Sequence, residues 1–104
     1  MKIARTKAFG GEVIAYDRER EDRDAIARAL CVERKAAYVH PFDDADVIAG
    51  QGTTGLEIME EVARRGVTLD AVLVNVSGGG LASGITVAVK DASLSTEMWT
   101  VEPA

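Results

Sequence analysis

The sequence predicts an α/β fold with a layered, mainly parallel sheet flanked by helices. Segments with helical spacing of apolar residues alternate with short apolar segments typical of strands. One of these, residues 71–76, is almost wholly apolar, as expected of a parallel strand that is covered on both faces. The order helix, strand, helix, strand occurs twice, and this order favours parallel strands joined by right-handed crossovers.

The first half of the chain predicts two helices and a strand. A helix over residues 1–9 is ended by a glycine pair, and residues 12–16 form a short strand. A charged run follows, in which Asp22 or Asp24 can cap a second helix that extends to about Lys35. This helix is expected to bury four small or apolar side chains, Ile26, Ala29, Leu30 and Cys31.

The sequence in the middle of the chain predicts a boundary between two halves of the structure. A brief strand over residues 37–39 ends at His40-Pro41, because proline favours an extended residue before it. Residues 42–52 contain three aspartates and predict an irregular connection between the two halves. A third helix then begins near Thr53 and ends at Gly66.

The last part of the chain carries the strongest local signal. The strand 71–76 runs directly into Ser77-Gly78-Gly79-Gly80, which is followed by a helix over residues 81–91 and a strand over residues 98–101. A strand, a glycine run and a helix together predict a phosphate cradle, since glycine lets a ligand approach the backbone and the helix start attracts anions. A tight turn that binds nothing is the structural alternative.

The glycine run departs from two motifs that bind nucleotides. No Lys-Ser/Thr pair follows it, so it is not a Walker A loop. The usual dinucleotide fingerprint requires glycine or alanine where this chain has Ser83. However, Glu102 follows the next strand, where such folds place the acid that binds the ribose. An NAD-type half-domain therefore stays open as an alternative.

The amino-acid composition indicates which kinds of ligand or partner the chain can bind. The 104 residues contain 12 Lys and Arg against 17 Asp and Glu, for a net charge of −5, which disfavours binding to a nucleic-acid backbone. A single cysteine excludes an internal disulfide and indicates a reducing, cytoplasmic location. No apolar segment approaches the ~18 to 20 residues that span a membrane. The expected ligands are small molecules or other proteins.

Three motifs in order carry a family resemblance. They are Tyr38-Val39-His40-Pro41-Phe42-Asp43-Asp44 with Asp46 to Thr53, then Leu73 to Leu81, then Val101-Glu102-Pro103. The chain resembles the central part of a threonine/serine dehydratase or serine racemase, which are pyridoxal-phosphate enzymes of fold type II, the tryptophan synthase beta-like fold. The resemblance implies that residues 1–40 belong to the small domain and residues 41–104 to the large domain, with one compact unit as the alternative.

The resemblance also implies the site. The backbone N–H groups of one continuous loop would hold the cofactor phosphate: Ser77, Gly78, Gly79, Gly80 and Leu81. Ser77 stands where the family usually has glycine, and Asn75 stands where it usually has proline. Glu102 matches a glutamate that binds a divalent cation in several members. The substrate of the parent family is an amino acid.

The lysine that bonds to the cofactor in this family has no counterpart in the part that the chain resembles. Lys90 lies about nine residues past the glycine run, which places it ~14 Å along the helix from the phosphate end. Lys2, Lys7 and Lys35 are expected on polar faces of the outer helices. We therefore expect a truncated piece of an ammonia-lyase or racemase, which carries the phosphate-binding loop but is not catalytic alone. A non-catalytic phosphate-binding module is the alternative.

The remaining candidates favour structural roles. Cys31 is interpreted as a buried small residue, His40 as a contact within its turn, and Phe42 and Trp99 as packing residues. Three aspartates are predicted to act in turns or caps rather than to bind a cation: Asp43, Asp44 and Asp46. Apolar strand residues that a longer protein would cover predict a homo-oligomer: Val72, Val74, Val76 and Trp99.

Overall fold

The computed structural model describes residues 1–103 and divides the chain into two compact units, Met1–Tyr38 and Val39–Ala104. The predicted boundary, between residues 40 and 41, lies two residues further along the chain. That these units are the small and large domains of a longer enzyme stays a prediction. Over the described part of the chain, no helix has the length and apolarity needed to cross a membrane.

The first unit contains α1 (Lys2–Ala8) and α2 (Arg23–Arg34). Of the two predicted caps, Asp22 begins α2, since its carboxylate accepts the backbone N–H groups of Asp24 and Ala25. The predicted burial of this helix is wrong, because α2 has no fully buried residue: Ile26, Leu30 and Cys31 are half-buried and Ala29 is exposed. Two short helices offer too little apolar surface to enclose these side chains.

Two predicted strands are absent. Residues 12–16 and 37–39 run without regular structure, and neither pairs its backbone with a strand in the part of the chain that the structure describes. The prediction was wrong because apolar alternation marks a segment that fits a sheet but does not supply the neighbouring strand. Instead, Arg34 of α2 binds the carboxylate of Glu12 through two N–H groups.

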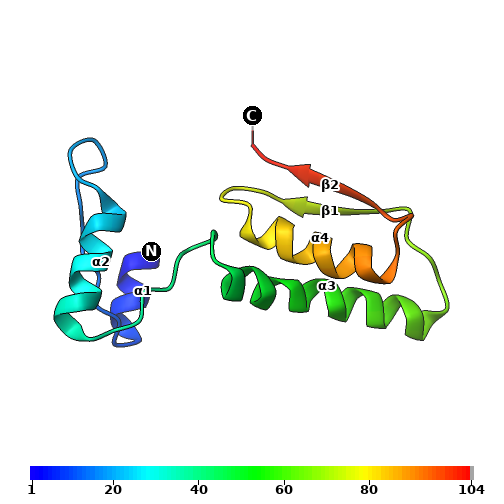
Figure 1. Cartoon of the computed structure of the whole chain (residues 1–104), viewed down its shortest axis with the longest axis horizontal. Helices are drawn as coiled ribbons and strands as arrows, with labels where there is room; N and C mark the ends of the chain where they lie inside the picture. The colour runs from blue at the N-terminus through cyan, green and yellow to red at the C-terminus, as the bar shows by residue number, and fades with distance from the viewer. Residues whose placement is uncertain (104) are drawn as a thin grey trace. The chain divides into compact units, whose positions relative to one another are not determined.

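The second unit is built of three layers (Figure 1). Strands β1 (Ala71–Asn75) and β2 (Glu97–Val101) form a two-stranded sheet, α4 (Gly80–Ala92) covers one face, and α3 (Ala45–Arg65) packs on α4. The strands are parallel, in register from Ala71 opposite Glu97 to Asn75 opposite Val101, and α4 connects them. The α/β class and the parallel strands are therefore confirmed.

Helix α3 begins eight residues earlier than predicted. Residues 42–52 do not form an irregular connection throughout, because Asp44 caps a helix that starts at Ala45. The carboxylate of Asp44 accepts the N–H groups of Asp46 and Val47, as expected of a cap. Gly52 suggested a loop, yet it lies inside the helix and is buried there, since a Cβ on it would come within 3.1 Å of the Gly84 oxygen on α4.

The core lies between α4 and β1. Four buried residues form it, Val74, Ala82, Ile85 and Val89, with Met59, Val72, Val76, Leu81 and Met98 packed around them. Thr96 is also buried, and its hydroxyl donates to the Leu69 oxygen at 3.0 Å and hydrogen-bonds with the Ser93 hydroxyl, whose Oγ lies 2.8 Å away.

The other face of the sheet is open over the described residues. Leu73 and Trp99 stand opposite each other in the register and are 67% and 57% exposed. The prediction that Trp99 is a packing residue is therefore wrong within this chain. Successive side chains of a strand point to opposite faces, so α4 covers Val72 and Val74 but not the residue between them.

Candidate functional site

The start of α4 offers unpaired hydrogen-bond donors. Gly79 precedes the helix with φ of 95°, a left-handed conformation that glycine adopts without strain. It supplies no side-chain cap, and the first helical bond runs from the Ser83 N–H to the Gly79 oxygen at 2.8 Å. The N–H groups of Gly80, Leu81 and Ala82 therefore lack acceptors among residues 1–103. Such groups at a helix start attract anions.

A hollow of about 370 Å³ lies beside this helix start. All five residues of the predicted loop line it, together with Ala82, Pro41, Phe42, Gln51 and Asn75. The side chains of Gln51 and Asn75 add amide groups to the backbone donors. Sequence reasoning missed Gln51, because its segment was interpreted as a loop rather than as a turn of α3 that faces α4.

Close contacts with Phe42 leave no room for a Cβ at two of the three glycines. A Cβ on Gly78 would come within 2.3 Å of the Phe42 ring, and a Cβ on Gly80 within 2.7 Å of the Phe42 backbone oxygen. The prediction that Phe42 is a packing residue is confirmed. Gly79 differs, because nothing lies within 4 Å of a Cβ built on it and only its positive φ requires glycine. The glycine run therefore serves both internal packing and the shape of the helix start.

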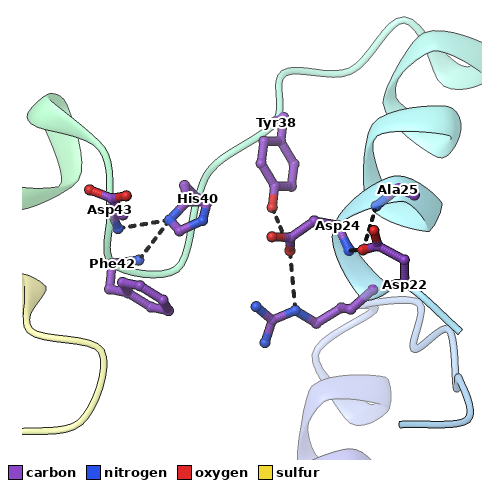
Figure 2. Close-up of polar contacts among 8 residues, drawn as sticks. Asp22, Asp24, Ala25, Tyr38, His40, Phe42 and Asp43 are labelled. Carbon is purple, nitrogen blue, oxygen red and sulfur yellow. Dashed lines mark hydrogen bonds and ion pairs between the residues drawn. The ribbon is translucent and has the colours of Figure 1, made fainter. Parts of the chain in front are cut away.

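His40 closes the turn that leads to Phe42 (Figure 2). Its Nδ1 accepts the backbone N–H of Asp43 at 2.7 Å and that of Phe42 at 3.4 Å. The predicted turn role of His40 and the cap role of Asp44 are confirmed. No group of three His, Cys, Asp or Glu residues that could hold a metal occurs within residues 1–103.

Glu102 lies at the same edge of the sheet as the glycine loop. The strands are parallel, and the Val76 N–H donates to the Val101 oxygen at 2.9 Å, so the chain leaves both strands at this edge. Glu102 is exposed there. One carboxylate does not make a Mg²⁺ or Ca²⁺ site, which needs several oxygen ligands.

The lysine of the second unit is engaged elsewhere. Lys90 Nζ donates to the Leu94 and Thr96 oxygens at 2.9 and 2.7 Å, beyond the C-terminal end of α4. The glycine loop lies at the opposite end of the same helix. This ammonium is therefore held away from the hollow.

A polar cluster in the first unit has a structural role. Figure 2 shows Tyr38 and Asp24 in contact, with the Tyr38 hydroxyl donating to Asp24 Oδ1 at 3.1 Å. The Arg28 guanidinium lies 4.8 Å from the centre of the Tyr38 ring. Burial, and then the bond to Asp24, raise the pKa of Tyr38, so the phenol keeps its proton and fastens the end of the unit to α2.

Comparisons with known proteins point to one family. The family described as "Pyridoxal-phosphate dependent enzyme" matches residues 1–104. The chain is 43% identical to L-threo-3-hydroxyaspartate ammonia-lyase of Saccharomyces cerevisiae over 103 residues, which are 99% of this chain and 30% of that protein. It is 40% identical to serine racemase of Schizosaccharomyces pombe over 102 residues, 98% of this chain and 30% of that one.

Two solved structures share the fold of this chain. A threonine deaminase from T.th. superposes with a TM-score of 0.88 at 47% identity, covering 98% of this chain and 33% of that one. Threonine deaminase isoform 2 from Solanum lycopersicum, in its processed form, superposes with a TM-score of 0.77 at 35% identity, covering 98% of this chain and 27% of that one. The chain thus spans about 30% of the length of the curated relatives it matches.

Proposed function

The chain belongs to the family of pyridoxal-phosphate dependent enzymes, and we propose that it supplies the phosphate-binding loop of an amino-acid ammonia-lyase or racemase of that family. The observation that carries the proposal is the uncapped start of α4 behind Gly79. Pyridoxal phosphate supplies an electron sink for cleaving bonds at the α-carbon of an amino acid. The residues of this chain would hold its phosphate.

The loop fits a phosphate group in shape and in charge. Backbone N–H groups of Ser77 to Leu81 are the proposed donors, and the three acceptor-rich oxygens of a phosphate match the unpaired donors at the helix start. The partial positive charge of the helix start favours the anion further. Gln51 and Asn75 line the same hollow and can hydrogen-bond to the rest of the ligand.

We propose further that the chain by itself does not turn over substrate. Covalent chemistry with this cofactor needs a lysine beside its aldehyde, and Lys90 is held beyond the far end of α4. Incubation with pyridoxal phosphate and L-serine or L-threonine is expected to yield no pyruvate or 2-oxobutyrate. Formation of either product, abolished by a lysine substitution, would contradict this part of the proposal.

Binding is tested with a probe that cannot react with lysines. Pyridoxine 5′-phosphate lacks the aldehyde, and pyridoxine lacks the phosphate as well. We expect the first to bind and the second not to bind in a calorimetric titration, with phosphorus NMR following the phosphate of the first. Equal binding of both, or of neither, would refute a phosphate site on this loop.

A matched pair of variants locates the site. Gly79→Ala and Gly66→Ala both place a Cβ at a positive φ, 95° and 66°, and both Cβ atoms meet nothing within 4 Å. Both changes strain the backbone, and Gly79→Ala does so more, since φ 95° and ψ −19° lie outside the left-handed region that Gly66 occupies at φ 66° and ψ 31°. We expect Gly79→Ala to weaken binding of the phosphate about tenfold or more, because the strain distorts the donors, and Gly66→Ala to leave it unchanged.

An NAD-type half-domain is the second candidate, and the position of Glu102 at the loop's edge of the sheet favours it. In that case NAD would raise the melting temperature, pyridoxine 5′-phosphate would not, and Glu102→Gln would abolish the effect of NAD. The same variant tests the predicted cation role of Glu102, through loss of any shift caused by Mg²⁺ or Ca²⁺.

Self-association and a cytoplasmic location complete the proposal. The exposed pair Leu73 and Trp99 and the unpaired edges of a two-stranded sheet favour a homo-oligomer. Sedimentation is expected to give a mass above the 11.1 kDa of one chain at high concentration, and Trp99→Ser is expected to lower it. A monomer at all concentrations would contradict the oligomer.

A further inference from the structure

The turn before α3 depends on one imidazole nitrogen. His40 Nδ1 accepts two backbone N–H groups, from Asp43 at 2.7 Å and from Phe42 at 3.4 Å. A ring nitrogen accepts only while it carries no proton, so this arrangement needs the tautomer with hydrogen on Nε2. The intervening Pro41 fixes its own φ and stiffens the turn.

The turn places Phe42 on the glycine loop. The His40 and Phe42 rings meet edge to face, with centres 4.9 Å apart and planes at 78° (Figure 2). The space that a side chain on Gly78 would need is filled by the Phe42 ring, and the space beside Gly80 by its backbone oxygen. Phe42 therefore touches the loop on both sides of Gly79, the residue whose positive φ shapes the helix start.

We infer that His40 is a positioning residue, which holds Phe42 against the loop and thereby sets the shape of the phosphate cradle. This inference rests on the proposed function. His40 acts through Phe42 and needs no contact with the ligand. When the acceptor at Nδ1 is lost, two backbone donors lose their partner, the turn loosens, and the loop loses the ring that supports it.

Two substitutions separate the acceptor from the rest of the side chain. Asparagine carries an oxygen at the place of Nδ1 and closes the same kind of turn, whereas leucine fills space without an acceptor. The readout is the amide NMR signals of Gly78, Gly79 and Gly80, which the ring current of Phe42 displaces. We expect His40→Leu to move these signals and His40→Asn to leave them nearly unchanged.

Ligand binding gives the second readout. We expect His40→Leu to weaken binding of pyridoxine 5′-phosphate about fivefold and His40→Asn to restore it, at similar melting temperatures. In a Phe42→Leu background the effect of His40→Leu is expected to vanish, because the two residues act in one chain of contacts. Phe42→Leu alone keeps the turn, and it should weaken binding of pyridoxine 5′-phosphate as much as His40→Leu does.

The outcomes are distinct. Glycine signals that stay in place in His40→Leu, or equal loss of binding in the leucine and asparagine variants, would overturn the inference. If His40→Leu does not fold, His40→Ala takes its place, because it also lacks the acceptor while keeping the Phe42 ring, and unchanged glycine signals in it overturn the inference. If the signals respond as expected but pyridoxine 5′-phosphate does not bind the unaltered chain, the proposed function fails while the link from His40 to the loop holds.

Discussion

The glycines of α3 allow one prediction to be worked from the structure. Gly50 and Gly55 lie in the same helix, but a Cβ on Gly50 meets nothing within 4 Å. A Cβ on Gly55 would lie 2.8 Å from the Cβ of Ala88 and 2.9 Å from the Ile85 oxygen, both on α4. Gly50→Ala and Gly55→Ala therefore differ in tertiary contact alone.

The magnitudes follow from this difference. Alanine is favoured over glycine in a helix by about 1 kcal/mol, so Gly50→Ala is expected to raise the free energy of unfolding by up to that amount. The same gain at Gly55 is opposed by overpacking, which costs about 3 kcal/mol where a backbone oxygen cannot move aside. We expect Gly55→Ala to lower the free energy of unfolding by about 2 kcal/mol, or the melting temperature by roughly 10 °C.

Urea unfolding is the assay, followed by far-UV circular dichroism and by the fluorescence of Trp99 on β2. Gly84→Ala extends the series, because its Cβ would lie 2.3 Å from the Ile48 oxygen, and it is expected to be the least stable. If Gly50→Ala and Gly55→Ala change stability by the same amount in the same direction, the close packing of α3 on α4 is wrong.

Three further outcomes are expected. Asp44→Ala should lower the free energy of unfolding by about 1 kcal/mol through loss of the α3 cap, while Asp44→Asn should keep most of it. Thr96→Val should cost about 1 to 3 kcal/mol, because the buried hydroxyl that donates to the Leu69 oxygen is lost, and Thr96→Ser should cost less. Hydrogen bonds from Arg64 and Arg65 lower the pKa of Glu61 from its usual 4.5, so its charged form stabilises the fold above that pH. The melting temperature of Glu61→Gln should therefore fall below that of the unaltered chain at neutral pH. The difference should vanish as the pH drops through the lowered pKa of Glu61. A difference that persists in acid would contradict the ion pairs of Glu61 with Arg64 and Arg65.

Local signals in the sequence determined much of this protein. The stop at Gly66, the apolar strand predicted over residues 71–76 and the helix after the glycine run are confirmed, and one of the two predicted caps, Asp22, begins α2; each depends on residues close to one another in the chain. The order of these elements was enough to predict parallel strands, and three motifs in order were enough to predict the family.

Contacts between distant residues decided the rest. Gly52 resembles a loop residue until α4 packs against it, and the ring that fills the space beside Gly78 comes from Phe42, which lies 36 residues earlier. Residues 12–16 have the pattern of a strand, but a strand forms only where a neighbour accepts its hydrogen bonds. The physical reason is common to all three: periodicity and propensity describe what a segment can become, while close packing and strand pairing depend on which other segment meets it.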